Sequence, residues 1–239
     1  MNRPYSHIFP TMIEIFTSVL TVMKLAIFDL DNTLIAGDSD HAWGEFLVAR
    51  GVVDKEWYQT TNDQFYADYC AGSLDIIAYS EFVFGFLAQH DLQTLQALHS
   101  EFMTEIIKPI MLPKAKALIA QHHQAGDRLL IITATNRFIT EPIAQAFAIP
   151  EILATEPELV AGRYTGKVLG VPCYQEGKIT RFHAWLAQQN TGFSETTFYS
   201  DSHNDLPLLK TVDKPIAVDP DDKLRLYAEQ HAWSIISLR

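Results

Sequence analysis

Residues 24–34 read Lys-Leu-Ala-Ile-Phe-Asp-Leu-Asp-Asn-Thr-Leu, and this stretch decides the fold. An apolar run ends here in two aspartates, Asp29 and Asp31, followed by turn-forming residues. Such a run is typical of a buried parallel strand that brings its carboxyl end to a site. Because side chains two positions apart on a strand point the same way, the two carboxylates should share one face. Like charges this close repel unless a proton or a cation lies between them. The stretch therefore indicates either a divalent-metal site with a free nucleophile or a plain turn after a strand.

Two later segments repeat the pattern of an apolar strand that ends in polar side chains. Residues 128–136 end in hydroxyl groups, and residues 196–205 end in two acids four positions apart. Between these segments a turn glycine precedes Lys178 at the start of an amphipathic helical pattern. This order of motifs resembles the haloacid dehalogenase-like phosphatase superfamily, from about Met23 to the C-terminus. The closer resemblance is to its subfamily IB, the phosphoserine-phosphatase-like and histidinol-phosphatase-like enzymes, whose lid follows directly after the first motif.

The resemblance implies a reaction through an aspartyl-phosphate and a role for each motif residue. Asp29 matches the nucleophile, and Asp31 matches the general acid that later activates water. Thr133 and Lys178 match the groups that neutralise the phosphate and the nucleophile. A Mg²⁺ site is expected from the Asp29 carboxylate, the Asp31 backbone carbonyl and Asp201, because such an all-oxygen, water-rich set suits this ion.

Further residues near the motifs are expected to support or bind the substrate. Asp205 should orient Lys178 and the metal ligand Asp201 without touching the substrate. Asn204 should contribute to phosphate binding. Asn136 and Arg137, which end and follow the second motif, are also expected at the substrate.

The choice of phosphate ester is expected to depend on the lid. Asp38 occupies the place of the acid that holds the substrate ammonium in the phosphoserine enzymes, whereas Val83 falls at or near the place of their carboxylate-binding arginine. A buried carboxylate without a partner is costly. The pattern therefore favours a cationic substrate without a carboxylate, with histidinol phosphate as the best guess. Arg137 could instead bind a substrate carboxylate, so phosphoserine is kept as an alternative substrate. A phosphotransferase that uses the same aspartyl-phosphate is a third alternative.

The amino-acid composition narrows the classes of molecule that the protein is expected to bind. The chain of 239 residues is 48% hydrophobic and carries a net charge of −11, without a lysine- or arginine-rich run. This balance argues against nucleic acid or an anionic membrane as the main partner. The resemblance implies a small phosphate ester as the substrate. Cys70 and Cys173 are far apart in the sequence, which fits a reducing cytoplasm rather than a disulfide framework. We expect a cytoplasmic monomer or homodimer.

The periodicity predicts an α/β fold, a Rossmann-like parallel sheet with an inserted helical-bundle cap. The expected domains are a catalytic core of residues 24–37 plus 112–239 and a cap of residues 38–111. Residues 1–23 are expected to form an N-terminal extension, either a short docked helix or the product of an upstream start. Strands are predicted over residues 24–30, 128–133, 151–155, 196–200, 215–218 and 234–237. Core helices are predicted over residues 113–124, 140–147, 178–189, 206–211 and 222–231, and cap helices over residues 40–50, 55–70, 74–89 and 92–108. A hairpin is predicted over residues 158–170.

Overall fold

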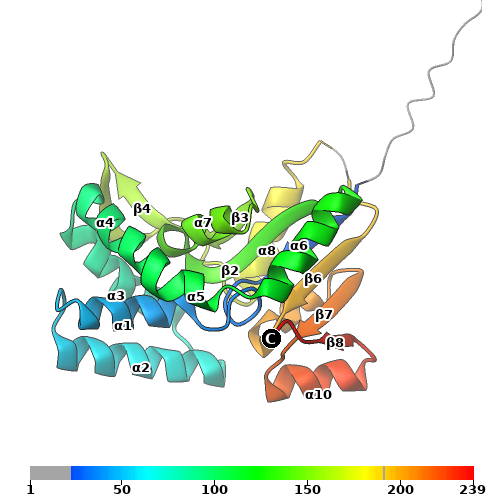
Figure 1. Cartoon of the computed structure of the whole chain (residues 1–239), viewed down its shortest axis with the longest axis horizontal. Coiled ribbons are helices and arrows are strands. Elements are labelled where there is room, and N and C mark those ends of the chain that lie inside the picture. The colour runs from blue at the N-terminus through cyan, green and yellow to red at the C-terminus, as the bar shows by residue number, and fades with distance from the viewer. Residues whose placement is uncertain (1–22, 191) are drawn as a thin grey trace, which may run out of the picture.

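The central strand of the sheet is β1 (Leu25–Phe28), which is buried at every position. In the computed structural model, which describes residues 23–190 and 192–239, β1 pairs in parallel with two strands far away in sequence. These are β2 (Arg128–Asn136) and β6 (Thr196–Ser200). The sheet is completed by β3 (Ile152–Thr155), β7 (Lys214–Val218) and β8 (Ser234–Ile236), in the order β3-β2-β1-β6-β7-β8 (Figure 1). Every pairing is parallel, so the predicted α/β sheet is confirmed.

Helices cover both faces of this sheet. On β1, Ala26 and Phe28 pack into one apolar cluster, and Leu25 and Ile27 pack into another on the opposite face. The first cluster includes residues of α6 (Pro113–Ala125) and α7 (Arg137–Ala146). The second cluster includes residues of α8 (Glu176–Leu186), α9 (Leu206–Leu209) and α10 (Asp222–Gln230). Burial on both faces explains why β1 reads as a continuous apolar run.

Between β1 and β2 the chain is helical, and an aspartate begins each of the first four helices. These are α1 (Ser39–Ala49), α2 (Lys55–Ala71), α3 (Ile76–Gln89) and α4 (Leu92–Phe102). Asp38, Asp54, Asp75 and Asp91 each accept backbone N–H groups of the first turn, which satisfies donors that have no partner within the helix. The helices lie to one side of the sheet (Figure 1).

The last predicted cap helix is not continuous. After α4 the chain forms a π-helix, η1 (Met103–Ile107), and then the short α5 (Lys108–Ile110). The N–H of Lys108 donates to the carbonyl of Met103, five residues back. Pro109 lies in the first turn of α5 and has no N–H, so it cannot donate to the carbonyl of the preceding turn and the α-helical ladder is interrupted there.

The segments that lead into and out of the helical stretch between β1 and β2 run side by side. Ile35 and Met111 form an antiparallel bridge, and the N–H of Ala36 donates to the carbonyl of Ile110 at 2.8 Å. The predicted hairpin consists of β4 (Pro157–Val160) and β5 (Arg163–Val168), and it packs against α3 of the cap.

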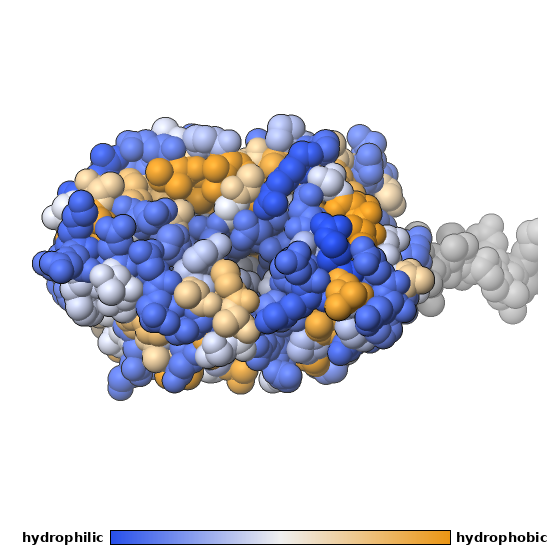
Figure 2. All heavy atoms as spheres, turned by 90° about the horizontal axis from the view of Figure 1, so that it is seen from below, coloured by the Kyte–Doolittle hydropathy of each residue, from blue (hydrophilic) through white to orange (hydrophobic). Residues whose placement is uncertain are grey.

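The predicted N-terminal extension lies, apart from Met23, outside the described residues. Within residues 23–190 and 192–239, none of the helices combines the length and the apolar character needed to cross a bilayer. Figure 2 views the face formed by α2 and α10, where hydrophilic residues cover most of the surface and apolar residues form small groups among them.

Candidate active site

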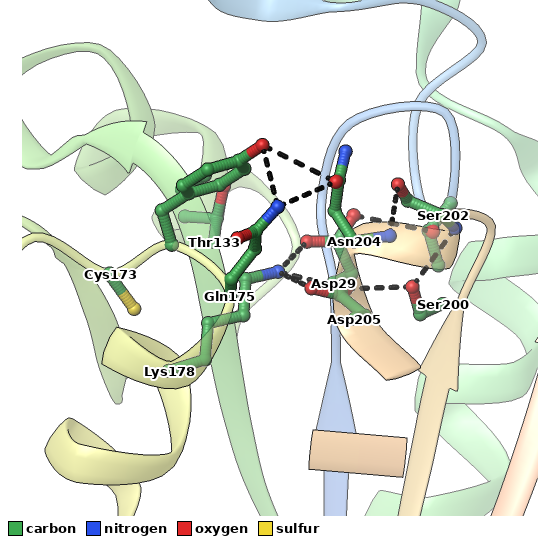
Figure 3. Close-up of polar contacts among 12 residues, drawn as sticks. Asp29, Thr133, Cys173, Gln175, Lys178, Ser200, Ser202, Asn204 and Asp205 are labelled. Carbon is green, nitrogen blue, oxygen red and sulfur yellow. Dashed lines mark hydrogen bonds and ion pairs between the residues drawn. The ribbon is translucent and has the colours of Figure 1, made fainter. Parts of the chain in front are cut away.

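Asp29 follows β1 directly and is paired with a buried lysine. Lys178 Nζ lies 2.8 Å from Asp29 Oδ1 and 2.6 Å from Asp205 Oδ1. Ser200 Oγ donates to Asp205 Oδ2 at 2.7 Å, so Asp205 is itself held in place. Figure 3 shows Lys178 reaching between the two carboxylates from α8. The sheet thus joins the predicted nucleophile, the predicted cation and its supporting acid in one buried cluster.

Burial and charge shift the pKa values in this cluster in opposite directions. Burial raises the pKa of Asp29 to about 7, although the charge of Lys178 acts to lower it. Burial works against a charged lysine, but the nearby Asp205 and Asp29 carboxylates raise the pKa of Lys178 above its ordinary value. Lys178 is therefore a fixed cation beside Asp29.

The backbone before α8 places Lys178. Gln175 has a φ of +46°, a backbone angle that residues other than glycine rarely adopt. A Cβ atom at Gly177 would lie 2.0 Å from the carbonyl oxygen of Pro172. Only glycine allows this approach, so the predicted turn glycine sets where α8 begins and hence where the Lys178 side chain enters the site.

Asp31 is held by two donors from different elements. The N–H of Ser39 donates to its Oδ1 at 2.6 Å, and Thr135 Oγ1 donates to its Oδ2 at 2.8 Å. Burial, together with the charge of Asp38, raises the pKa of Asp31 to about 6. A carboxyl group with a pKa near neutrality can both give and take a proton, as a general acid–base group must.

Asp201 and Asp29 share the hydroxyl of Thr33 as a hydrogen-bond partner. Thr33 Oγ1 lies 3.1 Å from Asp201 Oδ1 and 3.5 Å from Asp29 Oδ2, and it accepts from the N–H of Asp201. Burial, followed by the charges of Asp29 and Asp205, raises the pKa of Asp201 well above its ordinary value. Negative charge therefore accumulates here without enough positive charge to balance it.

This donor set fits Mg²⁺. In the described part of the chain, no three His, Cys, Asp or Glu side chains group into a complete metal site. Two carboxylates, a backbone carbonyl and water molecules are nevertheless the kind of coordination that Mg²⁺ accepts, since this ion keeps several waters. Asp29, the Asp31 carbonyl and Asp201 are the groups that would hold it.

A small cavity of about 40 Å³ opens onto Asp29, Asp31 and Thr133. Its wall contains four aspartates, Asp29, Asp31, Asp38 and Asp40, and four aromatic residues, Phe65, Tyr66, Tyr69 and Tyr79. The remaining lining residues are His41, Asn62, Leu74, Ile76, Ala134 and Thr135. Among the residues that the structure describes, neither lysine nor arginine lines the cavity. His41 packs on Tyr66 and lies 3.0 Å from Asp63. The cavity is acidic and aromatic.

Thr133 is 1% exposed and lies on β2 at the floor of this cavity. Its hydroxyl accepts from the N–H of Thr135 at 3.2 Å. Asp38 also reaches the cavity, but its Oδ1 accepts the N–H groups of Asp40 and His41, both at 2.9 Å, as the cap of α1.

Asn136 and Arg137 are placed differently from the prediction. Asn136 accepts from the N–H of Ile139 as the cap of α7 and donates to Asp40 Oδ1 at 3.3 Å, so it contacts the cavity wall rather than the cavity. Arg137 donates two hydrogen bonds to the Glu156 carboxylate, at 2.7 and 2.8 Å, and lines a separate groove. Its guanidinium is occupied outside the cavity, so its contact with the substrate stays a prediction that this geometry does not support.

Asn204 connects α2 with the residue before α8 and is not among the residues that line the cavity. Its Nδ2 donates to the carbonyl of Tyr69 at 3.1 Å, and its Oδ1 accepts from Gln175 Nε2 at 3.1 Å. Gln175 Nε2 also lies 3.4 Å from the carbonyl of Gly72, and Lys223 Nζ lies 3.1 Å from the carbonyl of Ala71. We call these three side chains, Asn204, Gln175 and Lys223, the α2 clasp, because each donates to a carbonyl at the C-terminal end of α2.

The sequence reasoning missed three parts of the site. The hydroxyl of Thr135 on Asp31 and the carboxylate of Asp40 in the cavity had no motif to mark them. Gln175 precedes the lysine motif, and only its backbone conformation distinguishes it. Of the three, Asp40 carried a signal, because it is a second acid soon after Asp38 in a segment expected to face the site.

Comparisons with known proteins agree with this architecture. The model of the haloacid dehalogenase-like hydrolases matches residues 26–210. A histidinol-phosphatase of Neisseria meningitidis serogroup C is 44% identical over 220 residues, which cover 90% of this chain and 99% of that protein. The phosphoserine phosphatase SerB1 of Mycobacterium tuberculosis is 30% identical over 217 residues, covering 90% of this chain and 70% of that protein.

A solved structure is also similar over nearly the whole length. It belongs to a protein of unknown function from Bordetella pertussis Tohama I, with a TM-score of 0.87 and 42% identity, and it covers 92% of this chain and 100% of that chain. A phosphoserine phosphatase structure with a phospho-aspartyl intermediate analogue shares the fold, with a TM-score of 0.65 at 15% identity, covering 91% and 94% of the two chains. The chain belongs to the haloacid dehalogenase-like hydrolase family, and it is a phosphatase.

Proposed function

We propose that the protein is a Mg²⁺-dependent phosphomonoesterase that acts through an aspartyl-phosphate on Asp29, with histidinol phosphate as its substrate. The observation that carries the proposal is the contrast between the two ends of the site. At one end Lys178 bridges the carboxylates of Asp29 and Asp205. At the other end the cavity offers carboxylates and aromatic rings, and none of its described lining residues is a lysine or an arginine.

The proposed chemistry has two steps. A carboxylate oxygen of Asp29 attacks phosphorus while the bond from phosphorus to the ester oxygen breaks, and Asp31 gives its proton to the departing alcohol. Asp31 then takes a proton from a water molecule that attacks phosphorus, and the bond to Asp29 breaks to release inorganic phosphate. Lys178 holds its charge beside Asp29 throughout, and Thr133 donates to a phosphate oxygen. Bound Mg²⁺ would neutralise charge on the phosphate.

The substrate part of the proposal rests on charge. A substrate carboxylate would lose its hydration in this cavity without a cationic partner, because Arg137 is bound to Glu156 and Val83 is buried. Substrate ammonium and imidazole groups, by contrast, would meet acids and aromatic faces. The similarity to the Neisseria histidinol-phosphatase supports the same choice over the phosphoserine alternative.

Hydrolysis of histidinol phosphate and phosphoserine by the purified protein tests this proposal. We expect kcat/KM for histidinol phosphate to be higher by ~10–100-fold. Chelation should stop turnover, and Asp29→Asn should abolish it without unfolding the protein. Equal or reversed preference would reject the substrate, and full activity without metal would reject the mechanism. Transfer of phosphate to an added alcohol, in place of release, would identify a phosphotransferase.

A further inference from the structure

Asp40 is a buried carboxylate that faces the cavity without a counter-charge. It is 7% exposed and lines the cavity with Asp31. Its hydrogen-bond partners are neutral, namely the amide of Asn136 at 3.3 Å and the hydroxyl of Tyr79. Within residues 23–190 and 192–239, no lysine, arginine or histidine forms an ion pair with it. A charge this deeply buried is costly unless something pairs with it.

Asp38 and Asp40 play different parts although they are two residues apart. Asp38 already accepts two backbone N–H groups through its Oδ1, and this cap begins α1. Asp40 caps nothing, and its carboxylate lies on the side of the cavity where α3 packs, beside Tyr79 and Val83. An amide at this position could accept the same bond from Asn136. The fold therefore uses the shape of the Asp40 side chain but has no use for its charge.

We propose that Asp40 is a specificity-determining residue that pairs with a second N–H-bearing cationic group of the substrate, an imidazole ring, while Asp38 meets the ammonium group. The proposal rests on the proposed function and deepens it, since it defines the substrate class as phosphate esters of amino alcohols with a second basic group. The aromatic residues Tyr66, Tyr69 and Tyr79 give a flat basic ring suitable faces to pack on.

A pair of substrates that differ only in the ring tests the role of Asp40. Histidinol phosphate and phenylalaninol phosphate share the ammonium group and the phosphate, but only histidinol phosphate has ring N–H groups. The wild-type protein should prefer histidinol phosphate, and Asp40→Asn should lower the ratio of the two kcat/KM values by ~10–100-fold. Asp54→Asn is the matched control, because it makes the same change at an exposed helix cap outside the cavity, and its ratio should equal that of the wild type.

The ratio separates recognition from folding. A purely structural role for Asp40 would lower both kcat/KM values together and would leave their ratio unchanged, which would overturn the proposal. A wild-type preference that survives in Asp40→Asn would likewise overturn it while the proposed function stands.

Failure of the proposed function gives a different result. If neither amino-alcohol phosphate is hydrolysed but an aryl phosphate is, the proposed substrate is wrong. Inhibition of aryl-phosphate hydrolysis by histidinol and by phenylalaninol then measures the same preference at the leaving-group site. Stronger inhibition by histidinol that Asp40→Asn removes would support the role of Asp40, and equal inhibition by the two alcohols would overturn it.

Discussion

At the scale of single residues, the site holds more negative charge than the fold can balance. Lys178 contacts Asp29 and Asp205, but Asp31, Asp38 and Asp40 have no such partner among the described residues. Backbone and hydroxyl donors stabilise the first two of these carboxylates. Function and stability are therefore in opposition at Asp40, where the charge has no structural partner.

We predict that Asp40→Asn stabilises the free protein increasingly as the pH rises above about 4, the ordinary pKa of an aspartate. Burial, followed by the charges of Asp38 and Asp31, raises the pKa of Asp40 well above its ordinary value. A group with a raised folded-state pKa favours folding at low pH, and this contribution is lost as the pH rises through that pKa. Asparagine has no such loss, and each unit of raised pKa corresponds to about 1.4 kcal/mol.

Urea unfolding of both proteins at several pH values measures this difference. The Asp54→Asn control replaces an exposed cap, so its effect on the free energy of unfolding should be small and nearly independent of pH. A variant less stable than the wild type at pH 8 would mean that the charge of Asp40 supports the fold.

At the scale of elements, the α2 clasp joins the end of α2 to α10 and to the residues before α8 and after β6. Its donors point at carbonyls of the helix end, where the helix dipole is negative. Gly72 ends α2 with a φ of +80°, and a Cβ atom there would lie 2.9 Å from His203 Nε2. Asn204 and His203 both lie next to the predicted metal-ligand loop, so the position of the cap is coupled directly to that loop.

Gly72→Ala should loosen this junction, and Gly51→Ala is its matched control. Both glycines have a positive φ, but a Cβ atom at Gly51 would meet nothing within 4 Å. Each substitution should lower stability by ~1 kcal/mol through backbone strain. Only Gly72→Ala should also raise KM and speed hydrogen exchange in α2. Equal effects of the two variants on KM would show that the clasp does not control the cap.

The elements also show what the sequence could predict. Apolar runs such as that of β1 identify buried parallel strands, and parallel strands bring Asp29, Thr133 and Asp201 to one edge of the sheet. The direction of a side chain beyond a strand end is not encoded in this way. Arg137 follows the second motif directly, yet it pairs with Glu156, which only the folded chain brings near. The π-helix similarly depends on packing that the periodicity of residues 92–108 does not reveal.

At the scale of the whole molecule, the net charge of −11 opposes the approach of a phosphate ester. Salt screens such long-range repulsion, with a Debye length near ~10 Å at 0.1 M. We therefore predict that kcat/KM for an aryl phosphate rises by about 2–5-fold between 20 and 200 mM KCl. Added salt should weaken the repulsion between the protein and the phosphate and so speed their association. Histidinol phosphate carries a compensating ammonium group and should respond less. Steady-state kinetics at several KCl concentrations measures how kcat/KM for each substrate depends on salt. A fall in kcat/KM for the aryl phosphate would mean that the local charge of Lys178 outweighs the net negative charge of the molecule.

The position of β1 at the centre of the sheet has a consequence for how the protein is made. Leu25 pairs with Arg128 on one side and with Thr196 on the other, so the strand carrying Asp29 is translated long before either neighbour. At ordinary rates of synthesis, roughly 10–30 s pass between the two ends of the β1–β6 pair. During this interval the nascent chain holds Asp29 without Lys178 or Asp201. The site can therefore assemble only after β6 and Asp201 have been synthesised, and the apolar faces of β1 need protection until then.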